Sequence, residues 1–509
     1  MKKKIGFLFG AGAEADYGLP TGGRFALDIF RYDQTMSKEN FKKMRANIDK
    51  ATNYANNWLP RNFDKNNISS YGKKVFETII KDTIEHNRKR IIKSLNEFDE
   101  FAENEVKKMK SEKINITEII EKNLAKDIRD SNMGQIISFV DVFDDGNKIF
   151  SNNYFSALLE LYKKKDFFKE SEKYEMGKIL TAILQLQVGA LSENLTRNIN
   201  DSLFKEKDDD IDIFDDLGEI IQLNYQSSGL SGIEYLLENR KYKENTESAK
   251  ILEFSQKIIE SIYSSVLDYK SLIDSNWHYL YCPMNEWAKF CKISIFLWTV
   301  REYILSQAQS VDFKTTKSYY DDLKKVIDSD EIDVTAIATT NYNTFISDIL
   351  NKKIIFMNGS VNMWYDPYLN KIETKDILDV LNQKGNHFLV PLLFTQSGTK
   401  PMTSITMAKN YVETYESWRE SDYLVIVGFG FNLDDEHING IIRTLINDDN
   451  KKIIVIRRKK ESTNVNQMKK EISDKLKINK KDNIIILELD KNRNINGSSW
   501  IEFICKDMK

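Results

Sequence analysis

The stretch Ile5 to Gly23, IGFLFGAGAEADYGLPTGG, decides the fold because an apolar run leads directly into a glycine-rich turn. The run Ile5 to Phe9 has no polar residue at alternate positions, which is typical of a strand buried on both faces of a parallel sheet. Gly10 and Gly12 lack the side chains that would hold a backbone away from a phosphate, and Ala13 to Tyr17 can open a helix whose N–H groups point at an anion. The spacing Gly-x-Gly-x-x-Ala predicts a nucleotide-binding turn, although no acidic residue follows where a Rossmann dehydrogenase needs one.

The same stretch imitates a secretory signal peptide, since three lysines precede the apolar run and small residues follow it. We do not favour that interpretation, because the run is short and Glu14 and Asp16 follow at once. No later stretch approaches the roughly 18-residue apolar length of a membrane span. We therefore expect a cytoplasmic protein with no membrane partner.

Composition limits the remaining possibilities. The chain has 509 residues, of which 30% are charged and 41% hydrophobic, and this length suits two or three domains. A net charge of −3 from nearly balanced acids and bases does not favour direct binding of nucleic acid. The cysteines Cys282, Cys291 and Cys505 form no Cys-x-x-Cys pair, so we expect a reducing compartment, no disulfide framework and no metal site.

A long middle segment has a helical character. It contains no proline between Pro60 and Pro283, and no glycine between Gly72 and Gly134. Two sets of apolar residues recur at helical spacing, which predicts helices packed on one another, although an interface with a partner chain would use the same pattern. These sets are Ile80, Ile84, Ile91, Leu95 and Phe98, and Ile251, Phe254, Ile258, Ile262, Val266, Tyr269 and Ile273.

One acidic run in this segment comes close to a calcium-binding loop. Lys205 to Asp216 reads KEKDDDIDIFDD, and counting from Asp208 places acids at positions one, three and five and Glu219 at position twelve. Ile213 occupies position six, where the loop needs glycine for its sharp turn. We therefore interpret the run as a solvated acidic loop rather than a cation site.

Small and amide residues follow the strands predicted after the helical segment. Three such groups are Thr339 to Asn343 (TTNYN), Asn358 to Ser360 (NGS) and Gly428 to Phe431 (GFGF). Ligands of open α/β sheets bind at the carboxyl ends of parallel strands, so these groups predict the site. The strands themselves are predicted at Val334 to Ala338, Ile354 to Met357, His387 to Leu393, Tyr423 to Val427, Ile453 to Ile456 and Ile484 to Leu487, with a helix at Val465 to Leu476.

The pattern predicts an α/β protein in which residues 1–30 and 284–509 form a Rossmann-like parallel sheet and residues 31–283 form a large all-helical insertion. At this point the residues resemble the sirtuins, specifically the sirtuin-like proteins of bacterial antiphage defence, over about 1–30 and 284–509. GAGAEADYGLP is similar to the sirtuin phosphate loop, TTNYN to its Thr-x-Asn-x-Asp element and NGSVNMWY to its His-Gly-Ser element. GFGFNLDDEHIN, Gly428 to Asn439, resembles the ribose loop and the Asp-x-His-Ile-Asn tail of the defence members.

Two departures from the family bear on chemistry. Asn358 stands where the family has histidine and Asn343 where it has aspartate. None of the four histidines, His86, His278, His387 and His437, falls between the two motifs. The paired Cys-x-x-Cys zinc module is also missing, so the resemblance implies a sirtuin-type sheet without zinc, and protein deacylation is not expected.

The resemblance implies an NAD glycohydrolase, which cleaves the nicotinamide–ribose bond and uses NAD as its substrate. Asn341 is expected to orient the attacking water, while Asn343 and Asn358 bond the carboxamide and the ribose hydroxyls. Because Asn358 cannot take a proton, the enzyme is expected to be slow or silenced. For His437, a structural and a catalytic role both remain open. The residues implied to contact NAD are Gly10, Ala11, Gly12, Ala13, Pro20, Thr340, Asn343, Gly359, Ser360, Gly428, Phe429, Gly430 and His437.

Three functions follow from these observations. The first is a bacterial antiphage effector that depletes NAD on activation, as in abortive infection, with the insertion closing the pocket or joining protomers of a homo-oligomer. The second is a catalytically weak NAD-binding subunit that works through a partner. The resemblance implies two kinds of partner, a hexameric translocase-like ATPase or an inosine-triphosphatase-like subunit. The third is a helical interaction protein with a vestigial nucleotide fold.

Overall fold

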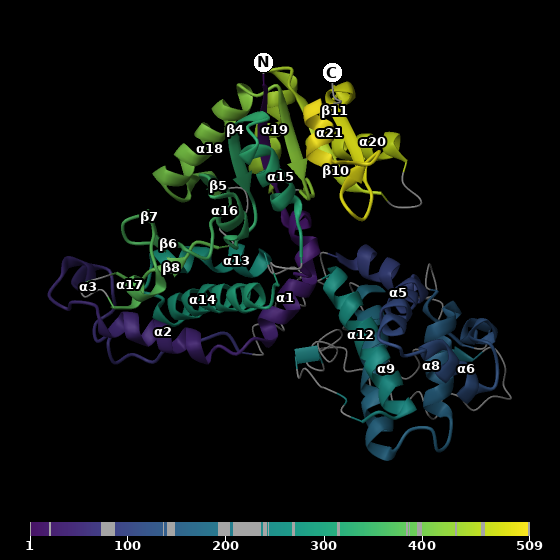
Figure 1. The fold of residues 1–509 in the computed structure, drawn as a ribbon. Helices are drawn as coiled ribbons and strands as arrows, with labels where there is room; N and C mark the ends of the chain where they lie inside the picture. The colour runs from purple at the N-terminus through teal and green to yellow at the C-terminus, as the bar shows by residue number, and fades with distance from the viewer. Residues whose placement is uncertain are drawn as a thin grey trace. The chain divides into compact units, whose positions relative to one another are not determined.

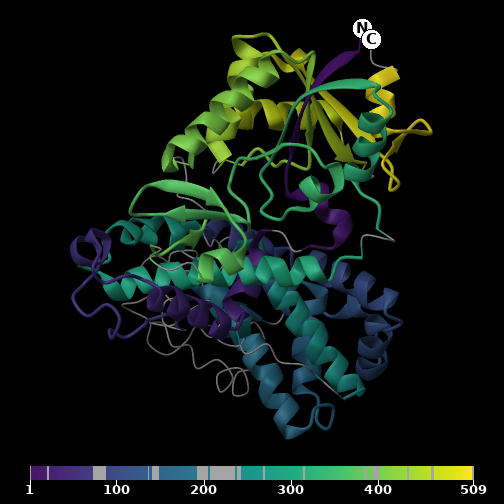
Figure 2. The ribbon, with the colours of Figure 1, turned by 60° about the vertical axis from the view of Figure 1, so that its left-hand side comes forward.

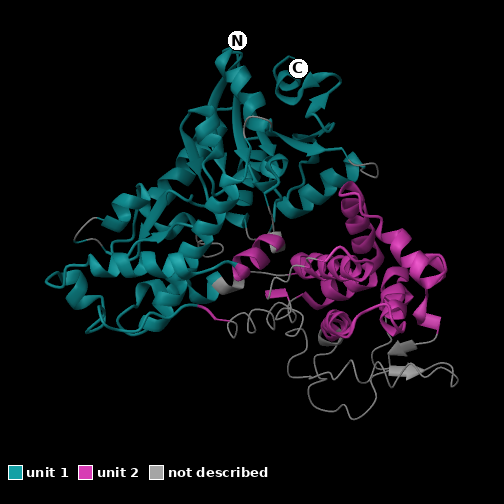
Figure 3. Cartoon of the chain, turned by 60° about the horizontal axis from the view of Figure 1, so that its bottom comes forward, with its two compact units in different colours: residues 1–21, 32–70, 270–509 teal, residues 22–31, 71–269 magenta. Residues whose placement is uncertain are grey.

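The computed structural model describes most of the chain. The described residues are 2–19, 22–72, 87–135, 137–139, 148–191, 204–206, 236–237, 242, 244–266, 270–312, 316–382, 385, 387–393, 400–432, 435–459 and 464–506. They divide into two compact units (Figure 3). Unit 1 comprises residues 1–21, 32–70 and 270–509, and unit 2 comprises residues 22–31 and 71–269. This division differs from the expected ranges, because 32–70 and 270–283 belong with the sheet and 22–31 belongs with the helical unit.

A six-stranded parallel sheet organises unit 1, with the strand order β11-β10-β9-β1-β4-β5. Numbered along the chain, this is the order 3-2-1-4-5-6 of a Rossmann fold read from β5. The prediction of a Rossmann-like α/β fold is therefore confirmed. The strands are β1 (Lys3–Phe9), β4 (Ile332–Thr339), β5 (Ile354–Phe356), β9 (Tyr423–Val427), β10 (Lys452–Arg458) and β11 (Ile484–Leu489).

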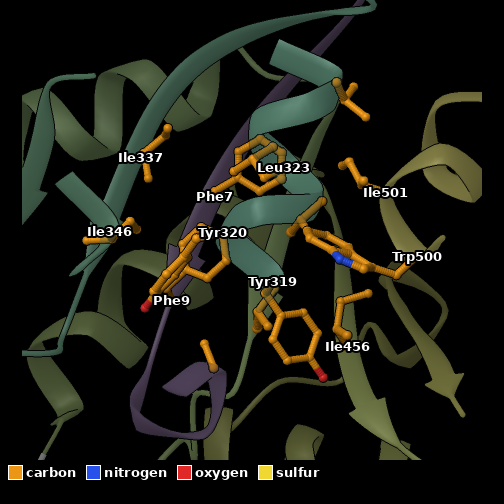
Figure 4. Packing of buried hydrophobic residues seen from close by; sticks show 14 of the residues in the cluster. Phe7, Phe9, Tyr319, Tyr320, Leu323, Ile337, Ile346, Ile456, Trp500 and Ile501 are labelled. Carbon is orange, nitrogen blue, oxygen red and sulfur yellow. The ribbon is translucent and has the colours of Figure 1, made fainter. Parts of the chain in front are cut away.

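Helices cover both faces of this sheet (Figures 1 and 2). On one face, Ile5, Phe7 and Phe9 of β1 pack in a buried cluster with residues of α15, α16 and α21. Figure 4 shows Tyr320 of α15 beside Phe9, and their ring centroids lie 5.2 Å apart. On the other face, Trp418 of α18 lies over Gly6. The helices around the sheet are α15 (Tyr319–Asp328), α16 (Phe345–Leu350), α18 (Ile405–Arg419), α19 (Glu436–Asn447), α20 (Val465–Leu476) and α21 (Trp500–Lys506).

A second layer of unit 1 packs around an aromatic cluster. Phe41 stacks on Phe388 with ring centroids 4.7 Å apart, and Trp287 and Phe290 complete the cluster. A three-stranded antiparallel sheet, β7-β6-β8, lies here. The elements are α2 (Thr35–Ala46), α3 (Asn53–Asn57), α13 (Lys270–Asn276), η6 (Trp277–Tyr281), α14 (Trp287–Gln309), β6 (Met363–Asp366), β7 (Lys371–Thr374), α17 (Ile377–Asn382) and β8 (Val390–Pro391).

The prediction that His387 to Leu393 adds a strand to the parallel sheet is wrong. Only Val390–Pro391 is a strand, and it pairs antiparallel with β6. The segment is held there because the indole of Trp298 donates a hydrogen bond to the carbonyl oxygen of Leu389. The remaining short elements of unit 1 are η1 (Ala11–Tyr17), η7 (Lys400–Thr403), η9 (Lys481–Asn483), β12 (Asn494–Ile495) and β13 (Ser498–Ser499).

Unit 2 is mainly helical. The predicted stripe from Ile251 to Val266 is buried along one long helix, as expected. The unit is not all-helical, because β2 and β3 form a short antiparallel pair. Its elements are α1 (Gly22–Arg31), α5 (Phe98–Ser111), α6 (Ile116–Leu124), η2 (Ile128–Asp130), η3 (Met133–Gln135), β2 (Ile137–Phe139), η4 (Ile149–Ser151), α8 (Asn153–Lys163), α9 (Glu170–Leu191), β3 (Phe204–Glu206) and α12 (Glu247–Val266).

Several predictions for this unit fall outside the described residues. Ile80, Ile84 and Tyr269 are among them, as is the acidic run from Asp208 onward, including Glu219. The start of that run is a strand rather than a loop, since Lys205 and Glu206 pair with β2. Among the helices that the structure describes, none is long and apolar enough to cross a membrane.

Candidate functional site

The loops that follow four neighbouring strands meet at one edge of the parallel sheet. Phe9 at the end of β1 is level with Val427 of β9 on one side and with Thr339 of β4 on the other. Thr339 is in turn level with Phe356, the last residue of β5. The four loops therefore all begin at the same level along the sheet, as the sequence predicted. They are the glycine turn, TTNYN, NGS and GFGF.

The glycine turn packs directly on the loop after β9. A Cβ on Gly12 would lie 2.8 Å from the Cα of Gly428, and Gly428 itself has φ +68°, a conformation that favours glycine. The N–H groups of Gly10 and Gly12 donate to the carbonyl oxygens of Val427 and Gly428, each at 2.9 Å. Ala13 donates likewise to the carbonyl oxygen of Gly10. Close packing of two loops is thus the physical reason for these glycines.

This arrangement differs from the phosphate cradle that the sequence predicted. The N–H groups of Gly10, Gly12 and Ala13 are bonded within the protein rather than directed at an anion. The turn also continues as a 3₁₀ helix, Ala11–Tyr17, instead of opening an α-helix. Ala11 and Gly12 are exposed, so the outer side of the turn remains open to a ligand. Pro20 lies outside the described residues.

Replacing Gly12 with valine is expected to destabilise unit 1 by about 1 to 3 kcal/mol, because the side chain would enter the backbone of Gly428. Gly440→Ala is the matched control, since nothing lies within 4 Å of a Cβ there and alanine favours the helix. Urea unfolding of both variants measures the effect. Equal stability of Gly12→Val and the parent would contradict the tight loop contact.

A buried network joins the glycine turn to TTNYN. Glu14, a residue for which the sequence suggested no role, accepts a 2.8 Å hydrogen bond from the hydroxyl of Tyr320 at Oε1 and another from Nδ2 of Asn343 at Oε2. Asn341 donates from Nδ2 to Tyr320 Oη and to the carbonyl oxygen of Gly10, both at 3.2 Å. Asn343 Oδ1 accepts from the N–H of Phe345 at the start of α16. The structure therefore brings Gly10, Asn341 and Asn343 together around Glu14.

Glu14 is an unusual acid because it is only 4% exposed. Burial raises its pKa to about 7, against hydrogen bonds from Asn343 and Tyr320 that lower it. Burial also raises the pKa of Tyr320 well above its ordinary value, so its hydroxyl stays protonated and can donate. Near neutral pH, the network therefore contains one group that changes charge.

A second group forms after β5. The side-chain oxygen of Asn358 lies 3.4 Å from Nε2 of His437, at the start of α19. The ring of Tyr411 packs edge-on against His437 with centroids 5.6 Å apart, and its hydroxyl donates to the carbonyl oxygen of Met357. The structure thus places Asn358 beside a histidine that is 79 residues away in sequence.

His437 is neutral and has an unused nitrogen. Burial, together with the positive charge of Lys400, lowers its pKa to about 3. A neutral imidazole carries one proton, and since Asn358 Oδ1 can only accept, Nε2 must be the donor. Nδ1 is then a buried acceptor that has no partner among the described residues, and Oδ1 of Asn439 is another. Both atoms require a donor, such as a hydroxyl group of a ligand.

The two groups are linked through Thr339. Its hydroxyl oxygen accepts from the N–H of Asn341, and its carbonyl oxygen accepts from the N–H of Met357, next to Asn358. Other predicted residues have structural contacts. Thr340 N–H bonds the carbonyl oxygen of Phe9, and the Gly430 carbonyl accepts from Lys475. Two further predicted residues are buried: Ser360 is 2% exposed and Phe429 is 3% exposed.

Gly359 shapes the turn that carries Asn358. Its φ is +87°, and a Cβ there would lie 1.9 Å from the carbonyl oxygen of Leu392. Only glycine fits both constraints, so this turn is fixed against the segment that follows β8. The position of Asn358 beside His437 depends on that turn.

No group of three or more histidine, cysteine, aspartate or glutamate side chains in the described ranges is arranged to hold a metal ion. Comparison of the chain with protein-family models gives no match, and comparison with curated proteins gives no significant relative.

Proposed function

We propose that this chain is a sirtuin-like NAD hydrolase that cleaves the nicotinamide–ribose bond. The observation that carries the proposal is the pair formed by Asn358 and His437 at the carboxyl edge of a Rossmann-like sheet. The unpartnered Nδ1 of His437 fits the chemistry of NAD, because a ribose hydroxyl supplies the donor that this buried nitrogen needs. Ala11 and Gly12 are exposed at the same edge and are proposed to face the pyrophosphate half.

The proposed reaction needs positioning more than proton transfer. The C–N bond breaks with its electron pair leaving on neutral nicotinamide, while a water oxygen bonds to the ribose C1 and one proton is released to solvent. Asn341 uses both Nδ2 hydrogens within the protein, so its Oδ1 is the atom proposed to hold the water. Nδ1 of His437 is proposed to accept a hydrogen bond from a ribose hydroxyl as positive charge develops on the sugar ring.

One observation favours a second candidate, an NAD-binding subunit with little activity. Neither the amide of Asn358 nor His437, whose pKa burial lowers to about 3, readily takes a proton near pH 7. Such a subunit is proposed to act through a partner, either a hexameric ATPase or an inosine-triphosphatase-like protein. Both candidates are proposed for the bacterial cytoplasm, in an antiphage defence complex or homo-oligomer.

Unit 2 is proposed to control the site through α1. This helix follows the glycine turn in sequence, yet it belongs to the helical unit. Arg31 and Arg24 each bind Glu260 of α12 at 2.7 Å, and Arg31 and Glu260 are buried. Separating a buried ion pair costs roughly 3 to 5 kcal/mol, so α1 is expected to follow any movement of α12. Such a movement would pull on the turn that carries Glu14.

Incubation of the full chain with NAD separates the candidates. Nicotinamide and ADP-ribose are quantified by chromatography, and NAD binding is measured by calorimetry. Release of nicotinamide by the chain alone supports the hydrolase. Binding without release supports the binding subunit, and the absence of both would overturn the two proposals and favour a helical interaction protein with a vestigial nucleotide fold.

A further inference from the structure

We propose that Glu14 is the positioning residue of this site: its carboxylate orients Asn343 directly and orients Asn341 through the hydroxyl of Tyr320. The inference rests on the proposed function and deepens it, because it identifies what regulates the same site.

The network has one consistent direction. Asn341 donates to Tyr320 Oη, and the Tyr320 hydroxyl can then donate its own proton only to Glu14 Oε1. Asn343 donates to the other carboxylate oxygen. Every bond therefore ends on Glu14 as an acceptor, which describes the ionised carboxylate. Protonation would make Glu14 a weaker acceptor and give it a hydrogen of its own, which the Tyr320 oxygen can accept only if the Tyr320 hydroxyl stops donating to that same oxygen of Glu14.

The orientation of Asn341 has a chemical consequence. Both Nδ2 hydrogens are committed, one to Gly10 and one to Tyr320, so Oδ1 is the end of the amide that is left for a water or a ligand. If the bond to Tyr320 is lost, the amide can rotate and present a donor instead of an acceptor. A misplacement of about 1 Å at such a group costs up to roughly 10² in rate.

Among the groups described around Glu14, Glu14 itself is the one that titrates near neutral pH. On its own turn, Tyr17 has its pKa raised to about 12, mainly by burial, and on α15 burial raises the pKa of Tyr320 well above its ordinary value. The loop after β4 contributes two asparagines, which do not titrate. We therefore expect the site to be ordered for catalysis when Glu14 is ionised and less ordered as the pH falls through about 7.

Three variants test the network in the full chain. Glu14→Gln keeps the size of the side chain but places a donor opposite Asn343 or Tyr320. Tyr320→Phe keeps the ring in the core and removes the hydroxyl that joins Asn341 to Glu14. Tyr17→Phe is the matched control, because the Tyr17 hydroxyl donates to Ser318 and its ring belongs to the same buried cluster.

The expected result is a loss in kcat rather than a rise in KM. The activity of the parent should rise between pH 6 and 8. Glu14→Gln should lack this rise, which we call the pH limb, and its kcat at pH 8 should be about 10- to 100-fold below that of the parent. Tyr320→Phe should lose part of the activity, and the double variant should be no slower than Glu14→Gln. An unchanged pH limb in Glu14→Gln, or an equal loss in Tyr17→Phe, would overturn the proposal.

A second measurement does not depend on turnover. The side-chain amide signals of Asn341 and Asn343, observed by NMR in chain labelled with ¹⁵N-asparagine, should shift between pH 6 and 8 in the parent and stay constant in Glu14→Gln. If the parent releases no nicotinamide at any pH, the proposed hydrolase activity fails while these shifts still decide the role of Glu14. Signals that do not respond to pH in the parent would overturn the positioning role.

Discussion

Replacing His437 with alanine is expected to lower kcat for nicotinamide release by about 10² to 10³, the usual effect of removing one hydrogen-bonding group that acts on the transition state. The reason is the buried Nδ1, which has no protein partner in the described part of the chain. Single-turnover release of nicotinamide measures the effect. His278→Ala is the matched control, because His278 is an exposed histidine whose ring lies 3.9 Å from that of Tyr279.

A histidine at position 358 provides the complementary test. Asn358 Oδ1 lies 3.4 Å from His437, so an imidazole placed there occupies the same part of the site. Asn358→His is expected to raise the rate of the parent and to restore part of the rate of His437→Ala, while Asn341→Ala should be inactive in either background. Equal rates for His437→Ala and the parent would remove His437 from the reaction.

The pH dependence of these variants distinguishes the protonation of Glu14 from the protonation of His437. Burial lowers the pKa of His437 to about 3, so its protonation cannot produce a change in activity between pH 6 and 8. A limb near pH 7 therefore belongs to Glu14 and should persist, at a lower rate, in His437→Ala. A limb that vanished with His437 would contradict this assignment.

The parallel sheet was predictable because local pattern is enough for a buried strand. A continuous apolar run between polar residues and a glycine located the strand Tyr423–Val427 with the bounds that the structure has. The short run from His387 to Leu393 carries the same apolar signal. Its pairing with β6, however, is set by the packing of α14, which no local pattern contains.

The site was predictable only as a set of loops. The carboxyl ends of parallel strands share an edge, so the grouping of Asn341 and Asn358 near the glycine turn followed from topology. The partners did not, because Glu14 meets Asn343 across 329 residues and His437 meets Asn358 across 79. Glu14 lies in a turn whose residues Ala11, Gly12 and Ala15 are exposed, and it packs against Tyr320, so its sequence position resembles that of a solvated acid. The one available signal was an acid two residues after the second glycine of the turn.

The stability of unit 1 is expected to fall by about 3 kcal/mol between pH 4.5 and 8 through Glu14 alone. In the folded chain, burial raises the pKa of Glu14 from its ordinary 4.5 to about 7. Below pH 4.5 the folded and unfolded states both hold the proton, and the contribution is fully present. As the pH rises toward 7, the unfolded state releases the proton first, so the folded state loses its advantage.

Glu14→Gln should abolish this part of the pH dependence, because glutamine does not titrate. All seven tryptophans, the first being Trp58 and the last Trp500, belong to unit 1, so urea unfolding followed by tryptophan fluorescence reports on this unit. Glu373→Gln is the control, since hydrogen bonds from Lys375 and Lys371 lower the pKa of Glu373, so its contribution to stability changes with pH only below about 4.5. Relative to the parent, Glu14→Gln should gain stability from pH 5 to pH 8, whereas the difference between Glu373→Gln and the parent should stay nearly constant over this range. A constant difference between Glu14→Gln and the parent at both pH values would mean that Glu14 titrates as an ordinary surface acid and that the network does not bury its charge.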